Sequence, residues 1–312
     1  MSAPPTGVWC PVVTFYDAET GLLDLEAQRQ YDSYLSKTGL AGLVILGTNA
    51  EAFLLTREER AQLIATAREA VGLEFPLMAG VSGFSTIQVL QFIDDAHKAG
   101  ANYALLLPPS YYGNATTLSV INAFYDEVAR KSPLPIIIYN FPGVCNGIDL
   151  DSETIAALAK RHPGKIVGVK LTCGNVGKIT RLGAELHPKA FSIFGGQSDF
   201  LLGGLAVGSA GCISAFANVF PKTVSEIYRL HKIGRTDEAL RLHQRAALAE
   251  SPCKAGIAST KYAVAIYSAP AAGIQQTESK LRPRAPYSPI SESAKEHVKA
   301  LMGSIAEVEK SL

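Results

Sequence analysis

Lys170 is the residue in this chain whose setting most favours chemistry. It ends the apolar run Lys165-Ile-Val-Gly-Val-Lys170, and a polar stretch follows it. Such a run is typical of a strand that delivers an amine to the mouth of a pocket. Apolar surroundings disfavour the charged form of a lysine, and the neutral amine can attack a carbonyl carbon to form a Schiff base. Structural lysines greatly outnumber catalytic ones, so other residues have to support this interpretation.

The elements that would position Lys170 follow a repeating strand and helix order. The gaps between the apolar runs leave room for a helix and two loops. Repetition of this unit predicts an α/β fold, the (β/α)8 TIM barrel, with a doubly wound open sheet as the alternative. The eight expected strands are 8–13, 41–47, 75–80, 102–107, 134–139, 165–170, 190–195 and 210–215.

Helix signals support this order. Thr56 and Glu59 form a capping box that predicts a helix to about residue 71. Near residue 221 the alternation gives way to a helical pattern that continues to the end of the chain. We therefore predict a barrel over residues 1–221 and a C-terminal helical extension, packed on the barrel, over residues 222–312.

In a barrel, chemistry takes place where the strands end. The fifth expected strand ends in Tyr139 and the sixth in Lys170, so the two side chains can face one cavity. A tyrosine there can move protons to and from a substrate oxygen. Thr48, just after the second strand, can orient that tyrosine. A core aromatic residue with a satisfied hydroxyl is the alternative for Tyr139.

Strand alternation extends this prediction along the sixth strand. If Lys170 points inward, Gly168 and Ile166 point inward too, and Gly168 leaves space beneath the amine. Val167 and Val169 then face the helices.

At these positions the chain resembles the pyruvate-dependent class I aldolase family. That family includes dihydrodipicolinate synthase, N-acetylneuraminate lyase, 4-hydroxy-2-oxoglutarate aldolase and 2-keto-3-deoxy sugar-acid aldolases. The resemblance covers roughly residues 8–300 and depends on four motifs in the expected order. They are Gly47-Thr-Asn-Ala-Glu51, Tyr139-Asn-Phe-Pro142, Gly168-Val-Lys170 and Gly195-Gly196.

The resemblance implies a role for each matching residue. Lys170 would form the Schiff base with pyruvate, Tyr139 would be the general acid and base, and Thr48 would act with them. Tyr112 would reach the site of a neighbouring subunit. No metal or other cofactor is expected, because the protonated Schiff base accepts the electrons. Thr48 and Asn49 would bind the pyruvate carboxylate through side chains and backbone N–H groups. The expected substrate-binding residues are Gly47, Thr48, Asn49, Gly196, Gln197, Ser198, Asp199, Ile213 and Ser214, with the backbone carbonyl of Ile213 facing the site.

Departures from the family pattern bear on the substrate. Dihydrodipicolinate synthase carries an arginine two residues after the proline of its Tyr-Asn-x-Pro motif, where it binds a substrate carboxylate. This chain has Val144 there, which cannot supply a bidentate grip on a carboxylate. Asn49 resembles the hydroxy-oxoglutarate branch, and Ala50 replaces the more usual glycine.

These features predict a lyase of carbohydrate catabolism that cleaves a 2-keto-3-deoxy sugar acid, such as 2-keto-3-deoxy-L-galactonate or a related hexulosonate. The products would be pyruvate and an aldehyde whose hydroxyls bind Gln197, Ser198, Asp199 and Ser214. The first alternative is 4-hydroxy-2-oxoglutarate aldolase, which needs a cation for the distal carboxylate, and no arginine is obvious on these loops. Dihydrodipicolinate synthase, an inactive ligand-binding barrel and a phosphosugar isomerase are further alternatives.

Composition limits the partners. The net charge is +1 without blocks of like charge, so neither nucleic acid nor an anionic membrane is an expected partner. The five cysteines form no C-x-x-C pair, which fits reduced thiols; Cys145 or Cys173 as a nucleophile is an alternative to Lys170. The adjacent aromatics Tyr111 and Tyr112 predict a homo-oligomer, a dimer or tetramer. No basic residue precedes Arg29, which predicts a cytoplasmic location.

Overall fold

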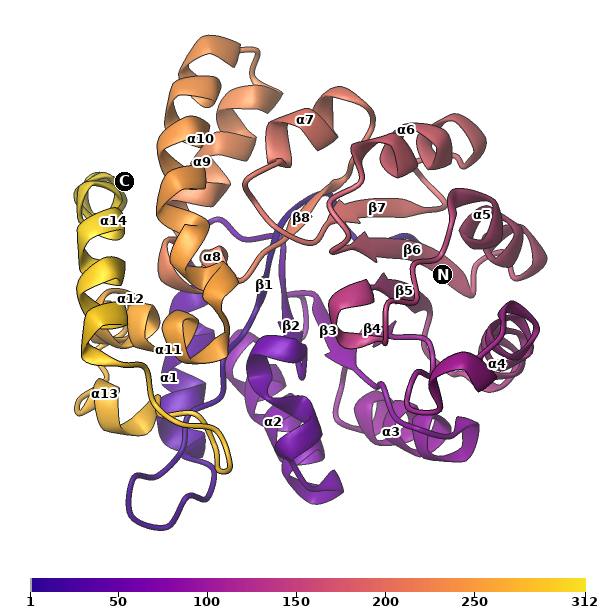
Figure 1. The fold of residues 1–312 in the computed structure, drawn as a ribbon, viewed down its shortest axis with the longest axis horizontal. Coiled ribbons are helices and arrows are strands. Elements are labelled where there is room, and N and C mark those ends of the chain that lie inside the picture. The colour runs from indigo at the N-terminus through magenta and orange to yellow at the C-terminus, as the bar shows by residue number, and fades with distance from the viewer. Residues whose placement is uncertain (1) are drawn as a thin grey trace.

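The computed structural model describes residues 2–312; Met1, the first residue of the predicted barrel, lies outside them. Eight parallel strands close into a barrel in chain order, as Figure 1 shows, so the predicted TIM barrel is confirmed. Each observed strand overlaps one predicted run. The strands are β1 (Gly7–Pro11), β2 (Gly42–Ile45), β3 (Leu77–Gly80), β4 (Tyr103–Leu106), β5 (Ile136–Asn140), β6 (Ile166–Leu171), β7 (Ser192–Gly195) and β8 (Gly211–Ile213).

Helices surround the barrel. The predicted capping box is present: Thr56 accepts from the Glu59 backbone N–H, and the Glu59 side chain accepts from that of Thr56. Within residues 2–312, no helix is long and apolar enough to cross a membrane. The helices that follow strands β1 to β8 are α1 (Leu25–Leu35), α2 (Arg57–Val71), α3 (Thr86–Lys98), α4 (Leu118–Lys131), α5 (Ser152–Arg161), α6 (Val176–Glu185), α7 (Leu201–Ala206) and α8 (Phe216–Val219).

The remaining helices gather beside β1 and α1, at the left of Figure 1. Both α8 and α9 pack against β1, and α14 packs against α9, α10 and α11. The division of the chain at residue 221 remains a prediction. These helices are α9 (Pro221–Lys232), α10 (Thr236–Glu250), α11 (Ile257–Ile266), α12 (Ser268–Ala271), α13 (Thr277–Lys280) and α14 (Glu292–Ser311).

Strand β6 departs from simple alternation. Ile136 pairs with Ile166, but the next residue, Ile137, pairs with Gly168, so Val167 is an extra residue in β6. Val167 packs in the inner barrel cluster and Ile166 in the outer one, the reverse of our prediction. A bulge of one residue changes the side to which the preceding side chains point. Beyond the bulge the pairing is regular, and Val169 faces the helices as predicted.

Gly168 does not leave open space beneath the amine, contrary to our expectation. A Cβ atom there would lie 2.7 Å from the backbone oxygen of Ser192 and 3.1 Å from Cδ1 of Ile137. Glycine therefore permits a close approach of β6 to its neighbouring strands.

We expect Gly168→Ala to lower the free energy of unfolding by about 1–3 kcal/mol, because backbone must move to admit the methyl group. Thermal or denaturant unfolding measures this change. Gly203→Ala is the matched control, since that helical position is open and alanine there should stabilise by about 0.5–1 kcal/mol. Equal stability of Gly168→Ala and the wild type would contradict the close approach.

Candidate active site

Lys170 and Tyr139 meet inside the barrel at the ends of β6 and β5. They are register partners on neighbouring strands, and the Lys170 Nζ donates a hydrogen bond of 3.2 Å to the Tyr139 hydroxyl. Nζ also lies 4.3 Å from the centre of the tyrosine ring. Lys170 is only 3% exposed. An amine so placed has little water around it and a proton-transfer partner within hydrogen-bond reach.

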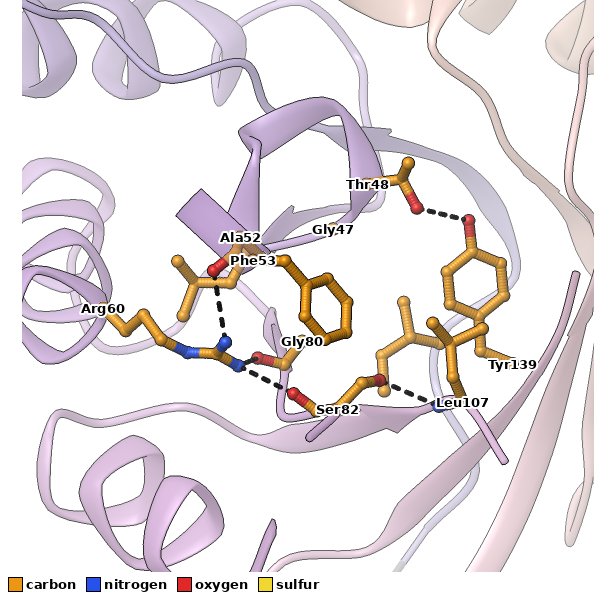
Figure 2. A pocket seen from close by; sticks show the side chains of 11 residues that line it. Gly47, Thr48, Ala52, Phe53, Arg60, Gly80, Ser82, Leu107 and Tyr139 are labelled. Atoms are coloured by element: carbon orange, nitrogen blue, oxygen red, sulfur yellow. Dashed lines mark hydrogen bonds between the residues drawn. The ribbon is translucent and has the colours of Figure 1, made fainter. Parts of the chain in front are cut away.

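Thr48 completes this group from the end of β2. Its Oγ1 lies 3.2 Å from the Tyr139 hydroxyl oxygen, and Figure 2 shows the two side chains pointing toward each other. Thr48 begins a 3-10 turn, Thr48–Ala50, which we call the Thr48 turn. The Tyr139 hydroxyl therefore lies between the lysine amine and the threonine hydroxyl, in a position suited to relaying a proton.

These side chains line a cavity of about 280 Å³ that opens to solvent. Its walls come from the ends of β2, β5, β6 and β7 and from the segment that joins α10 to α11. The C-terminal helices thus contribute one wall, which the sequence did not predict. The lining residues are Thr48, Asn49, Tyr139, Phe141, Lys170, Thr172, Gly196, Gln197, Ala215, Glu250, Cys253, Lys254, Gly256 and Ile257.

A second, much smaller cavity lies behind Thr48 and Tyr139, and Figure 2 shows Arg60 on its far side. The guanidinium of Arg60 donates to the carbonyl oxygens of Gly80 (2.9 Å) and Ala52 (3.3 Å). Burial lowers the pKa of Arg60 to about 10. Arg60 thereby joins the end of β3 to the loop that follows the Thr48 turn.

Ser198 and Ser214 both donate hydrogen bonds to the carboxylate of Glu250. Ser198 donates to this carboxylate from its backbone N–H (3.0 Å) and its hydroxyl (2.7 Å), and Ser214 donates from its hydroxyl (3.1 Å). Burial raises the pKa of Glu250, while these hydrogen bonds oppose the shift. The two serine hydroxyls predicted to bind substrate are thus engaged within the protein, and Glu250 itself lines the cavity.

Lys254 is a cation on the cavity wall, and it forms an ion pair with Oδ2 of Asp199. The other Asp199 oxygen, Oδ1, is buried and has no hydrogen-bond partner within residues 2–312. The Thr172 hydroxyl, which lines the cavity, is buried and unpartnered in the same part of the chain. An unpaired buried polar atom is costly, so the Thr172 hydroxyl is suited to a bound molecule, whereas Asp199 is not among the residues that line the cavity.

Sequence reasoning missed several cavity residues, among them Thr172, Glu250 and Lys254. Thr172 had a usable signal, because it follows Lys170 by two residues and so points to the same side of the strand. Glu250 and Lys254 had none, since they reach the site from the end of α10 and the turn after it.

The other predicted site residues have different placements. Asn49, Gly196 and Gln197 line the main cavity, and Gly47 lines the smaller one. Ile213 ends β8 with its side chain in the inner barrel core. Tyr112 is 75% exposed on the surface, with its ring against that of Tyr111.

The alternative cysteine nucleophile finds little support. Cys145 is buried, and burial raises its pKa to about 11, which disfavours the reactive thiolate.

Within residues 2–312, no group of three or more His, Cys, Asp or Glu side chains is arranged to hold a metal ion.

The chain is similar to known aldolases over nearly its whole length. The chain is 66% identical over 309 residues to a protein of Coccidioides immitis (strain RS) named "Putative 4-hydroxy-2-oxoglutarate aldolase, mitochondrial", covering 99% of this chain and 98% of that one. It is 37% identical to the L-threo-3-deoxy-hexylosonate aldolase of Aspergillus niger, covering 98% and 96%. A crystal structure of the Escherichia coli K12 protein YagE with pyruvate matches with a TM-score of 0.86 and 25% identity over 96% and 98%.

The predicted cytoplasmic location is wrong by this comparison. The Coccidioides relative and one from Emericella nidulans, 39% identical over 84% of this chain and 85% of that one, both carry "mitochondrial" in their names. The prediction relied only on the scarcity of basic residues before Arg29, which is a weak indicator of compartment.

The family itself follows from the whole length of the chain. The model of the dihydrodipicolinate synthetase family matches residues 4–305. A crystal structure of a dihydrodipicolinate synthase family protein from Coccidioides immitis superposes with a TM-score of 0.94 at 63% identity, covering 99% of this chain and 98% of that one. The chain therefore belongs to the dihydrodipicolinate synthetase family of pyruvate-dependent class I aldolases.

Proposed function

We propose that the enzyme cleaves 4-hydroxy-2-oxoglutarate to pyruvate and glyoxylate through a Schiff base on Lys170. The observation that carries this proposal is the position of the Tyr139 hydroxyl, 3.2 Å from both the Lys170 amine and the Thr48 hydroxyl. This arrangement supplies a nucleophile and a proton carrier side by side at the buried end of the cavity.

Formation of the Schiff base takes two steps in this geometry. The neutral Lys170 amine attacks the C2 ketone, and a proton moves from nitrogen to oxygen to give a carbinolamine. The C2 hydroxyl then leaves as water with the proton of Tyr139. These steps produce a protonated iminium beside a tyrosinate, which Thr48 stabilises by donating a hydrogen bond.

The positive charge of the iminium and the negative charge of the tyrosinate both promote cleavage of the C3–C4 bond. The tyrosinate takes the proton of the C4 hydroxyl, the C3–C4 bond breaks, and its electrons pass into the iminium. The aldehyde leaves, and pyruvate remains on Lys170 as an enamine. Tyr139 protonates the enamine at C3, water adds to the new iminium with loss of a proton to the tyrosinate, and pyruvate departs.

The substrate preference differs from our first prediction for two reasons. Ser198 and Ser214, expected to bind sugar hydroxyls, already donate to Glu250. Lys254 lines the cavity and is the cation that the search for an arginine had not found; its ammonium is paired with Asp199 but carries three N–H donors, so it can also bind a substrate carboxylate. A lysine on this wall can neutralise the distal carboxylate of 4-hydroxy-2-oxoglutarate. The name of the Coccidioides relative, 66% identical, supports the same substrate.

A second candidate substrate is an L-threo-3-deoxy-hexulosonate. The position of Gln197 on the cavity wall favours it, because a side-chain amide can donate a hydrogen bond to a sugar hydroxyl or accept one from it. Relatives named for this activity, 37% identical, also support it. The dihydrodipicolinate synthase reaction is disfavoured by Val144, which stands where that enzyme has arginine.

Borohydride reduction in the presence of pyruvate tests the Schiff base. Peptide mass spectrometry should find the reduced adduct on Lys170 and not on Lys165 or Lys178. Incubation with 4-hydroxy-2-oxoglutarate and with the hexulosonate should then release glyoxylate or the sugar aldehyde. Failure of folded protein to form any adduct would reject the proposed chemistry and favour an inactive barrel.

Lys254→Met should raise KM for 4-hydroxy-2-oxoglutarate about tenfold to a hundredfold, since loss of a charge-assisted contact costs about 1.5–3 kcal/mol. Pyruvate trapping on Lys170 should change little, because pyruvate lacks the distal carboxylate. Initial-rate kinetics of glyoxylate release provide the measurement. Lys160→Met, which removes a surface partner of Glu185, is the control. An unchanged KM in Lys254→Met would exclude this role for Lys254.

We also propose that Tyr112 completes the site of a neighbouring subunit in a homodimer or homotetramer. Its exposed ring is in edge contact with Tyr111, whose ring contacts Phe84 in turn. An exposed aromatic group of this kind is typical of a subunit contact. A dissociated variant that keeps full activity would contradict this proposal.

A further inference from the structure

Glu51, the residue that follows the Thr48 turn, has a constrained backbone and a buried side chain. Its φ angle is +57°, in the left-handed region that a residue other than glycine occupies only where its surroundings hold it there. Its carboxylate points away from the substrate cavity. Oε1 accepts a hydrogen bond of 2.6 Å from Lys261 Nζ, and Oε2 accepts one of 2.6 Å from the backbone N–H of Arg284.

Lys261 comes from helix α11, in the C-terminal part of the chain. The side chains of Lys261 and Glu51 are 0% and 2% exposed, so the ion pair is shielded from water. Lys261 also donates to the carbonyl oxygen of Arg282 (3.1 Å), and its Nζ lies 4.5 Å from the centre of the Tyr16 ring. Removal of either partner would leave the other charge buried without compensation.

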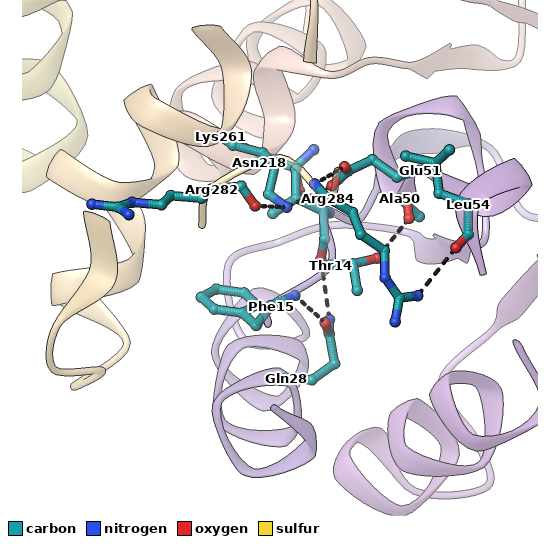
Figure 3. Close-up of polar contacts among 11 residues, drawn as sticks. Thr14, Phe15, Gln28, Ala50, Glu51, Leu54, Asn218, Lys261, Arg282 and Arg284 are labelled. Atoms are coloured by element: carbon teal, nitrogen blue, oxygen red, sulfur yellow. Dashed lines mark hydrogen bonds and ion pairs between the residues drawn. The ribbon is translucent and has the colours of Figure 1, made fainter. Parts of the chain in front are cut away.

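Two more contacts hold the same stretch of chain from the same side, as Figure 3 shows. Thr14 donates from its hydroxyl to the carbonyl oxygen of Ala50 (2.7 Å), the last residue of the Thr48 turn. Arg284 donates from its guanidinium to the carbonyl oxygen of Leu54 (3.1 Å). The cavity side of the turn thus stays free for substrate, while the opposite side is anchored to the loop after β1, to α11 and to the segment after α13.

We propose that Glu51 and Lys261 are positioning residues for the substrate carboxylate. They hold the Thr48 turn so that Thr48 and Asn49 present their hydrogen-bond donors to the cavity; this inference rests on the proposed role of those two residues. The C-terminal helices therefore take part in substrate binding through α11, in addition to forming a wall of the cavity.

The Glu51–Lys261 ion pair preorganises the Thr48 turn for binding. The Thr48 turn contains few hydrogen bonds of its own, among them Ala50 N–H to Gly47 O (3.1 Å) and Glu51 N–H to Thr48 O (3.0 Å). Without the ion pair, the strained Glu51 backbone can relax, and the turn can then move relative to Tyr139. Displacement of a binding group by about 1 Å is enough to weaken binding or catalysis by up to about a hundredfold.

Glu51→Gln and Lys261→Met test this proposal, together with the double variant that removes both charges. The pyruvate concentration for half-maximal borohydride trapping on Lys170 should rise about tenfold or more in all three, whereas the rate at saturating pyruvate should fall far less. The double variant should recover thermal stability lost in the single variants, because no unpaired charge remains buried. Its affinity for pyruvate should stay low, which separates positioning from stability.

Amide hydrogen exchange of the peptide covering residues 46–55 is the second readout, and it does not depend on catalysis. Exchange there should accelerate in all three variants. Glu309→Gln is the matched control, because Glu309 is a buried carboxylate that accepts from Thr223 N–H (2.7 Å) at the start of α9. It should lose stability and keep both normal exchange at 46–55 and normal pyruvate affinity.

The outcomes distinguish this inference from the proposed function. If wild-type protein forms no adduct with pyruvate, the Schiff base is rejected, and exchange alone decides whether the ion pair holds the turn. If the adduct forms and the three variants keep wild-type pyruvate affinity and exchange, Glu51 and Lys261 do not position the turn. Loss of affinity in proportion to loss of stability, with full recovery in the double variant, would likewise overturn the proposal.

Discussion

Lys170→Met is expected to lower the rate of pyruvate release by at least about four orders of magnitude, because the covalent intermediate cannot form without the amine. Methionine is nearly as long as lysine and apolar, so it can occupy the buried space between β5 and β7 without leaving a charge or a void. Borohydride treatment with pyruvate should leave the variant without a reduced adduct. Kinetics with 4-hydroxy-2-oxoglutarate and intact-protein mass spectrometry measure the two effects.

Lys165→Met is the matched control for this prediction. Lys165 lies five residues earlier, before β6, and its Nζ donates to the carbonyl oxygen of Ser132 (2.9 Å) away from the cavity. The control should keep its activity and its adduct. Activity of Lys170→Met within tenfold of wild type, or an adduct that persists, would show that another group is the nucleophile.

Tyr139→Phe should lower kcat by about 10²–10⁴-fold and change KM much less, since it removes the proton carrier and keeps the ring. The ring should still stack on Phe141, from which its centre lies 5.8 Å away. Lys170 should remain able to form the adduct, but more slowly, because no acid then assists the departure of water. Rapid-quench borohydride trapping separates this slower formation from slower cleavage.

Tyr125→Phe provides the comparison. The Tyr125 hydroxyl is buried outside the barrel and donates to the carbonyl oxygen of Leu106 (2.8 Å). Its removal should cost about 1 kcal/mol of stability and leave kcat unchanged. If Tyr139→Phe behaves in the same way, with kcat within threefold of wild type, Tyr139 is a structural residue and the proton carrier lies elsewhere.

The barrel and the central pair of residues could be read from the sequence for a local reason. Each strand is buried on both sides, so it appears as a continuous apolar run, and runs separated by room for a helix specify a parallel barrel. The polar residues that end such runs must then lie together at one face. The sequence therefore predicts that Tyr139, Lys170 and Thr48 lie together. In the structure, the Tyr139 hydroxyl is within hydrogen-bond distance of both the Lys170 amine and the Thr48 hydroxyl.

Local patterns failed where the outcome depended on contacts between distant segments. The extra residue Val167 in β6 is invisible in an apolar run, because either direction of its side chain meets a hydrophobic core. Whether the hydroxyls of Ser198 and Ser214 can bind substrate depends on Glu250, which accepts hydrogen bonds from both and lies at the end of helix α10.

The sequence by itself determined the fold class, the candidate nucleophile and its proton-transfer partner, since strand burial and strand order follow from short-range composition. Tertiary structure alone decided which polar groups remain available to the substrate. Hydrogen bonds and ion pairs such as Glu51–Lys261 join residues far apart in the chain, and no local pattern encodes which donor will satisfy a given buried acceptor. The acceptor side of this active site is therefore a property of the packed C-terminal helices as much as of the barrel.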